Sequence, residues 1–194
     1  MKFLLSLLAV FSFAFSPSWA MDLICPPAKI CYAIDESESI SGTEFAQLNA
    51  ALVEITNTFS TAAPGSSFAA VDFSGLQNGG GVGEVVSPLT SDVTTFLAAL
   101  AANPKRGGFT SSGTGLNLCD QELDGQAQPK VILLITDGVD NRNPIGVDVE
   151  AAIKANGNTV AVVGIGDNLN DDDLRDTISS SPDLYTFVDD FSAL

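Results

Sequence analysis

Residues 130–136 read KVILLIT, and Asp137 and Gly138 follow directly. The apolar residues inside this segment do not alternate with polar ones, which is typical of a strand that is buried on both faces of a parallel sheet. The Asp-Gly pair predicts a turn at the carboxyl end of that strand. Because ligand sites in open parallel sheets gather at this edge, the segment predicts the centre of the fold and the neighbourhood of a site.

Similar β-rich runs recur along the chain between helix-like segments. This order predicts a doubly wound, three-layer α/β fold, with a mostly parallel central sheet and helices on both faces. Strands are expected at residues 29–34, 67–73, 130–136 and 159–165, with a short fifth strand near 83–86. Helices are expected at residues 43–59, 91–102, 112–123, 147–156 and 171–179. In the first helix, apolar residues at three- and four-residue steps predict one buried stripe, formed by Phe45, Leu48, Leu52, Ile55 and Phe59.

The beginning of the chain has the features of a cleaved secretion signal. Lys2 supplies a positive charge, an apolar run follows from Phe3 to Phe15, and Ser18-Trp19-Ala20 offers the small-x-small pattern for cleavage. The apolar run is shorter than the roughly 20 residues that cross a bilayer. We therefore expect a signal peptide at residues 1–20 and one secreted domain at residues 21–194, with no membrane insertion of the mature chain.

The charge balance and composition exclude several classes of function. Lys and Arg number 8 against 24 Asp and Glu, and loss of Lys2 with the signal would leave 7 minus 24, or −17. Such a surface repels nucleic acid and anionic lipid. A hydrophobic content of 45% argues against disorder. Because the chain has no histidine, it lacks the commonest general base, the Ser-His-Asp triad and the ligand of most catalytic zinc sites.

Three segments place oxygen-bearing side chains at strand ends or helix starts. They are DESES at 35–39, GGFT at 107–110 and TDG at 136–138. Alternate residues of an extended segment face the same way, so the first segment can direct its aspartate and both serines to one point. Each segment alone is an ordinary helix cap or turn. Together they offer two carboxylates and three hydroxyls, a set that suits hard cations such as Mg²⁺, Ca²⁺ or Mn²⁺.

The mature chain contains three cysteines, Cys25, Cys31 and Cys119. An odd number in an exported chain predicts one disulfide with a leftover thiol, or pairing between molecules. Cys31 lies about 13 Å along a strand before Asp35, and Cys119 lies about 13 Å along a helix after Thr110. Cys119 is therefore expected to be bonded, with Cys31 or Cys25 as its partner, and a buried free thiol is the alternative.

Three stretches resemble the metal-site segments of the von Willebrand factor type A family: AIDESESIS, GGFTSSGTGLNLC and KVILLITDGVDN. Outside them, VDFSG resembles the second core strand of the family and VVSPLTSDVTTFLAAL the strand and helix after it. NTVAVVGIGDNLNDDDLRDTISS resembles the late strand, glycine turn and helix. The resemblance covers nearly the whole mature chain, from about Ile30 to Leu194.

This resemblance implies a metal-ion-dependent adhesion site made of Asp35, Ser37, Ser39, Thr110 and Asp137. In the family, the hydroxyls bind the ion directly and the aspartates bind it directly or through water. An acidic side chain of a partner can fill the open position. The resemblance thus implies a secreted, non-enzymatic domain that binds an extracellular protein ligand presenting a carboxylate, through a divalent cation that is Mg²⁺ in the first instance and otherwise Mn²⁺ or Ca²⁺.

Two features depart from the family pattern. Glu38 stands where the family often has glycine; we expect its side chain to point to solvent, although it could compete with a ligand carboxylate. The family usually continues into a long final helix after a DFxxL-like segment, whereas this chain stops at Leu194. The final helix is therefore expected to be missing, which puts signalling by a shift of that helix in doubt.

The same residues are compatible with functions other than metal-dependent binding. A metal-dependent hydrolase would use the same oxygens, but its general base would have to be Glu36 or Glu38. A scaffold domain would carry a vestigial metal site. A phosphate-binding loop is rejected because Thr114 stands where that motif needs lysine. The run Asp171–Asp173 is interpreted as the acidic first turn of a helix rather than as a second metal site.

Overall fold

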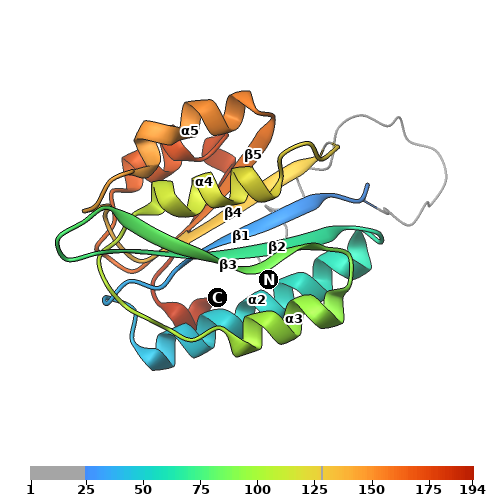
Figure 1. Ribbon diagram of the computed structural model, residues 1–194, viewed down its shortest axis with the longest axis horizontal. Coiled ribbons are helices and arrows are strands. Elements are labelled where there is room, and N and C mark those ends of the chain that lie inside the picture. Colours follow the sequence, from blue (N-terminus) through green and yellow to red (C-terminus); the bar gives the residue numbers. More distant parts are fainter. Residues whose placement is uncertain (1–24, 128) are drawn as a thin grey trace.

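Figure 1 shows the computed structural model of the protein, which describes residues 25–127 and 129–194. The predicted signal peptide at 1–20 lies outside the described residues. Six strands form one sheet in the spatial order β3-β2-β1-β4-β5-β6. They are β1 (Lys29–Asp35), β2 (Ser67–Gly75), β3 (Gly81–Thr90), β4 (Lys130–Thr136), β5 (Asn158–Ile165) and β6 (Tyr185–Val188). Only the edge strand β3 is antiparallel to its neighbour, so the predicted mostly parallel sheet is confirmed.

Helices cover both faces of the sheet, as the sequence predicts. The longer helices are α2 (Gly42–Ala62), α3 (Val93–Ala102), α4 (Ser112–Glu122) and α5 (Gly146–Ala155). Helices α4 and α5 lie on one face, and α2 and α3 lie on the other (Figure 1). The predicted helix at 171–179 contains a π-helical stretch, η1 (Asp173–Ile178), and short 3-10 helices occur at η2 (Pro182–Leu184) and η3 (Phe191–Ala193). No helix within 25–127 or 129–194 is long and apolar enough to cross a membrane.

The burial of each strand explains how well the sequence predicted it. All residues of β2 and β4 are buried, and their apolar runs match the predicted ranges closely. The predicted short strand near 83–86 is the centre of the longer β3, which is only partly buried because it forms the edge. The short strand β6 was not predicted, since its four residues are mostly only half-buried.

Helix α2 begins directly after the DESES segment, and its start is fixed by a capping box. The Ser41 hydroxyl accepts a hydrogen bond from the Glu44 backbone N–H at 3.3 Å, and the Glu44 carboxylate accepts one from the Ser41 N–H at 2.8 Å. The predicted stripe on this helix is buried throughout. The cap and the stripe together fix how the chain leaves the end of β1.

A disulfide joins the sheet to α4. Cys31 in β1 and Cys119 in α4 are bonded, with their Cα atoms 5.6 Å apart, and both residues are completely buried. The prediction that Cys119 is bonded is confirmed, and its partner is Cys31 rather than Cys25, which is a partly exposed free thiol. The bridge ties together the two elements that lead to Asp35 and follow Thr110.

Candidate metal centre

The candidate site lies where the strand order reverses. Strand β1 pairs with β2 on one side and with β4 on the other, and all three run parallel. Ile34 of β1 is level with Ile135 of β4, so the residues that follow them emerge at the same edge. Crevices at such a switch point are the usual ligand sites of open α/β sheets.

Asp35 is completely buried, and its carboxylate is fixed from two sides. One oxygen accepts a hydrogen bond from the Ser37 backbone N–H at 2.8 Å, and the other accepts one from the Thr136 hydroxyl at 2.6 Å. The first bond shapes the turn after β1, while the second joins the ends of β1 and β4. The turn is therefore held in one conformation by side chains from both strands.

The hydroxyls of the DESES segment form a continuous chain of oxygens with Asp137. The Ser37 and Ser39 hydroxyl oxygens are 2.9 Å apart, and the Ser39 hydroxyl donates to the Asp137 carboxylate at 2.7 Å. Ser37 is buried, Ser39 is exposed and Asp137 is half-buried. The chain thus runs from the interior of the sheet edge to the surface.

Thr110 approaches this chain of oxygens from the loop before α4. Its N–H donates to the Asn141 side-chain oxygen at 3.0 Å, and its carbonyl accepts from the N–H groups of Asn141 and Arg142 at 3.1 and 3.0 Å. A Cβ atom placed on Gly138 would lie 3.4 Å from the Thr110 hydroxyl and 4.0 Å from the Ser39 hydroxyl. Both hydroxyls therefore face the same side of Gly138.

The Thr110 hydroxyl itself makes no hydrogen bond to any of the described residues, although Thr110 is only 4% exposed. Its oxygen is not fully enclosed, so it can meet a ligand that approaches from the surface. All five predicted site residues are thus brought to one edge of the sheet: four share hydrogen bonds at the ends of β1 and β4, and the fifth, Thr110, faces them with its hydroxyl unpaired.

Burial makes both carboxylates of the site poor anions on their own. It raises the pKa of Asp35 to about 6, although hydrogen bonds from Thr136 and Ser37 oppose the shift and repulsion from Asp137 adds to it. Burial also raises the pKa of Asp137, against the hydrogen bond from Ser39. Two nearby carboxylates that resist ionisation favour an added positive charge beside them.

Glycines let the Thr110 loop pack against the DESES segment. The Gly108 carbonyl accepts from the Glu38 N–H at 2.7 Å, and the Gly107 N–H donates to the Glu36 carbonyl at 3.1 Å. Gly108 has a φ of 121°, and a Cβ there would lie 2.6 Å from the Gly75 carbonyl oxygen. Any other residue would push the loop away from β2.

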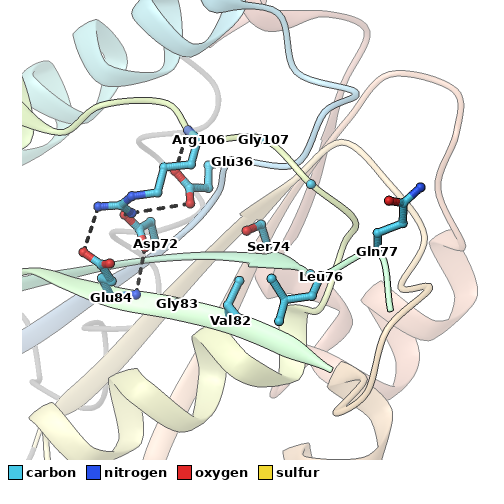
Figure 2. A pocket seen from close by; sticks show the side chains of 12 residues that line it. Glu36, Asp72, Ser74, Leu76, Gln77, Val82, Gly83, Glu84, Arg106 and Gly107 are labelled. Carbon is cyan, nitrogen blue, oxygen red and sulfur yellow. Dashed lines mark hydrogen bonds and ion pairs between the residues drawn. The ribbon is translucent and has the colours of Figure 1, made fainter. Parts of the chain in front are cut away.

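The acidic residues between the site residues have different environments. Glu38 is exposed, as expected. Glu36 is 2% exposed and turns to the other side, where its carboxylate accepts from the Arg106 N–H at 3.1 Å and pairs with the Arg106 guanidinium at 3.5 Å (Figure 2). Burial, followed by repulsion from Asp72, raises the pKa of Glu36 to about 7. Glu36 therefore belongs to a salt-bridge cluster beside the predicted site.

Sequence analysis missed the residues that hold the loops together. Asn141 orients Thr110, and Asp140 accepts hydrogen bonds from the Ser112 and Gly146 N–H groups at 2.5 and 2.8 Å, which joins the starts of α4 and α5. Arg106 pairs with carboxylates from three segments. The one signal for Arg106 was the adjacent basic pair Lys105-Arg106 directly before two glycines, in a chain with few basic residues.

Comparison with known proteins gives one family match and many related structures. The sequence profile of the von Willebrand factor type A domain matches residues 30–194. Comparison with curated proteins finds no significant match. Proximal thread matrix protein 1 from the mussel byssus is 26% identical, with a TM-score of 0.75 over 86% of this chain and 44% of that one.

Two further structures extend the comparison. The same mussel protein with a zinc-occupied MIDAS motif is 25% identical, with a TM-score of 0.74 over 86% of this chain and 45% of that one. The pilus adhesin SpaC from Lactobacillus rhamnosus GG shares the fold at 17% identity, with a TM-score of 0.69 over 87% of this chain and 29% of that one. The present chain thus spans less than half the length of each of these structures.

Proposed function

Because the chain belongs to the von Willebrand factor type A family, we propose that it is a secreted, metal-dependent protein-binding domain. A divalent cation would be held by Asp35, Ser37, Ser39, Thr110 and Asp137, and an acidic group of an extracellular protein partner would complete its coordination. The family is commonly involved in adhesion and protein binding, so the general role follows from membership. The metal site and the acidic partner are our proposal for this chain.

The observation that carries this proposal is the unpaired hydroxyl of Thr110 beside the chain of oxygens from Ser37 through Ser39 to Asp137. These groups are polar, close together and largely buried, and the nearest carboxylates favour added positive charge. A cation would give the Thr110 hydroxyl its missing partner and neutralise the carboxylates. The residues present therefore fit a bound divalent ion.

The donors favour a hard ion. Three hydroxyls and two carboxylates, without nitrogen or sulfur, suit Mg²⁺ best, with Mn²⁺ and Ca²⁺ as alternatives. The mussel matrix protein holds zinc at its MIDAS motif, so zinc belongs among the ions to be tested. When bound, the ion would supply an incompletely neutralised positive charge that attracts a partner carboxylate.

Accessibility supports contact from the Ser39 side of the site. Ser39 is exposed and Asp137 is half-buried, whereas Asp35 is completely buried. Val139, two residues after Asp137, is 45% exposed and offers an apolar contact beside the site. A partner would thus meet the ion at the surface, while Asp35 holds it from below.

A binding role is preferred to hydrolysis because neither candidate base is held at the site. Glu36 is engaged by Arg106, Glu38 is exposed to solvent, and the chain contains no histidine. Secretion is supported by the signal-like leader and by the Cys31–Cys119 disulfide, since disulfides persist mainly in oxidising compartments. We therefore propose a non-enzymatic role outside the cell.

Calorimetric titration of the chelated protein with Mg²⁺, Mn²⁺, Ca²⁺ or Zn²⁺ tests the metal site. We expect one ion to bind, and Mg²⁺ at a hundred times its dissociation constant to raise the free energy of unfolding by about 2.7 kcal/mol. For a domain of this size that is about 5–10 °C in melting temperature. Asp137→Asn and Ser39→Ala should abolish the shift, while Asp124→Asn, in an exposed turn after α4, should retain it.

The same variants test partner binding. The intact mature protein would be used to capture proteins from the extracellular fraction, once with Mg²⁺ and once with chelator. A partner retained only with Mg²⁺, and lost with Asp137→Asn but not with Asp124→Asn, would support the proposal. Ion binding without metal-dependent capture would reject the bridging role, and the absence of any ion binding would identify a scaffold domain.

A further inference from the structure

A second hollow lies beside the candidate metal centre, between the β2–β3 hairpin and the two loops that carry site residues. We call it the hairpin pocket; it has a volume of about 640 Å³ and is lined by parts of 72–77, 82–84 and 106–108 together with Glu36 (Figure 2). Glu36 directly precedes Ser37, and Gly108 stands two residues before Thr110. The pocket and the candidate metal centre therefore share their loops.

One end of the hairpin pocket is charged. Arg106 is 38% exposed, and its guanidinium lies 2.6 Å from Asp72, 2.8 Å from Glu84 and 3.5 Å from Glu36 (Figure 2). Three carboxylates thus face one guanidinium, which leaves two negative charges in excess when all are ionised. Because Arg106 is already shared among three anions, the pocket repels a further anion and attracts a cation.

The remaining lining supplies an apolar wall and one unpaired hydroxyl. Leu76 is 54% exposed and Val82 is half-buried, and both lie on the opposite side of the pocket from Arg106 (Figure 2). Ser74 lies between these two sides and is only 2% exposed. Within the described part of the chain, its hydroxyl has no hydrogen-bond partner. The hydroxyl oxygen itself is not fully enclosed, so it opens into the hollow and is free to bind a polar ligand there.

We propose that the hairpin pocket takes the basic side chain, Arg or Lys, of a protein partner. The aliphatic stem would lie along Leu76 and Val82, and the cationic head would contact the Glu84 carboxylate and the Ser74 hydroxyl. Long basic side chains bury their methylene groups in this way while their charged end stays at a polar surface. Glu84 is suited to the contact because it is 68% exposed and its second carboxylate oxygen makes no hydrogen bond or ion pair to the described residues.

This inference rests on the proposed function for its partner and extends it to the partner's sequence. Glu36 lines the pocket and Ser37, the next residue, belongs to the candidate metal centre, so the two places border each other. We expect one partner segment to present a carboxylate to the ion and a basic side chain to the pocket. The partner would then need a basic residue for the hairpin pocket as well as the acidic residue that binds the ion.

The test uses the intact mature protein with chelator present, so that it does not depend on the metal site. N-acetyl-arginine amide, N-acetyl-lysine amide and the uncharged N-acetyl-citrulline amide are titrated separately while backbone amide resonances are followed by NMR. We expect the two basic probes to bind in the millimolar range and to shift the amides of Ser74, Val82 and Glu84. Citrulline amide has nearly the shape of the arginine probe and should bind several times more weakly.

Matched variants localise the interaction. Glu84→Gln removes an exposed carboxylate and should weaken binding of the basic probes about twofold to fivefold, the effect of one exposed ion pair. Ser74→Ala should weaken it as well, whereas Glu54→Gln, on the exposed face of α2, should leave it unchanged. Equal binding of citrulline amide, shifts that avoid the pocket, or no response to Glu84→Gln would overturn the proposal, even if Mg²⁺ binds as expected.

Discussion

Replacing Arg106 by methionine should destabilise the protein by about 2–3 kcal/mol. The change leaves two almost completely buried carboxylates without their cation, since Asp72 is 0% and Glu36 is 2% exposed. Removing one partner of a fully buried ion pair costs about 3–5 kcal/mol. We expect a smaller loss here because Arg106 is 38% exposed and because the Glu84 backbone N–H still donates to Asp72 at 2.8 Å.

The loss would be measured by guanidinium chloride unfolding of the disulfide-bonded mature protein, in chelator so that no ion contributes. It corresponds to a fall of about 4–12 °C in melting temperature for a domain of this size. Arg142→Met is the matched control: its guanidinium donates only to backbone carbonyls and lies 3.5 Å from the Phe109 ring centre. That variant leaves no buried carboxylate without its cation, so its loss should come only from exposed hydrogen bonds and a surface ring contact.

A double variant separates the lost charge from lost packing. Asp72→Asn removes one of the two unpaired charges, so in the Arg106→Met background it should recover about half of the lost stability. The reasoning would be refuted if Arg106→Met changed the free energy of unfolding by less than about 0.5 kcal/mol, the usual range of surface substitutions. Failure of the double variant to recover any stability would show that charge is not the cause.

Three further predictions concern covalent, steric and titratable features. Cys31→Ala with Cys119→Ala opens a bridge with a sequence separation of 88 and should lower the free energy of unfolding by about 2–4 kcal/mol, measured by denaturant unfolding. Gly113→Ala would place a Cβ 2.6 Å from two backbone carbonyl oxygens and should cost about 1–3 kcal/mol, whereas Gly42→Ala, with nothing within 4 Å, should cost nothing; equal melting temperatures would contradict this. In chelator the protein should become more stable as the pH falls from about 7 to 4, because the folded-state pKa of Asp35, about 6, lies above its ordinary value of 3.8, so that its favourable contribution is complete below 3.8 and is lost as the pH rises through 6; Glu36, with a pKa of about 7, acts in the same direction. Asp35→Asn should reduce that dependence in thermal melts at a series of pH values and leave the part due to Glu36, and an unchanged slope would show that Asp35 does not titrate as described.

Local patterns predicted the fold because each buried element carries its own signal. The run Val131–Ile135 is apolar at every position, and the structure buries all of β4. The stripe on α2 follows helical spacing and is buried in full. Where burial is incomplete, as in the half-exposed β6, the apolar pattern is weak and the strand was not predicted.

The sequence also predicted the five candidate metal ligands, for a related reason. Each lies within three residues of a strand end or a helix start, and parallel strands bring their carboxyl ends to one edge. The sequence did not reveal which hydroxyl lacks a partner. Thr110 is unpaired only because Asn141 and the glycines before it position its loop, and these are contacts between distant parts of the chain.

Local sequence patterns therefore establish the order and type of the main elements, the edge at which they end and the types of side chain found there. Contacts across the fold establish that Cys31 rather than Cys25 bonds Cys119, that Glu36 faces Arg106, and that Ser74 lines the hairpin pocket. The difference lies in the distance along the chain over which each effect acts. Periodicity and capping act within a few residues, whereas the register that sets Ile34 beside Asp72 joins segments far apart in the chain.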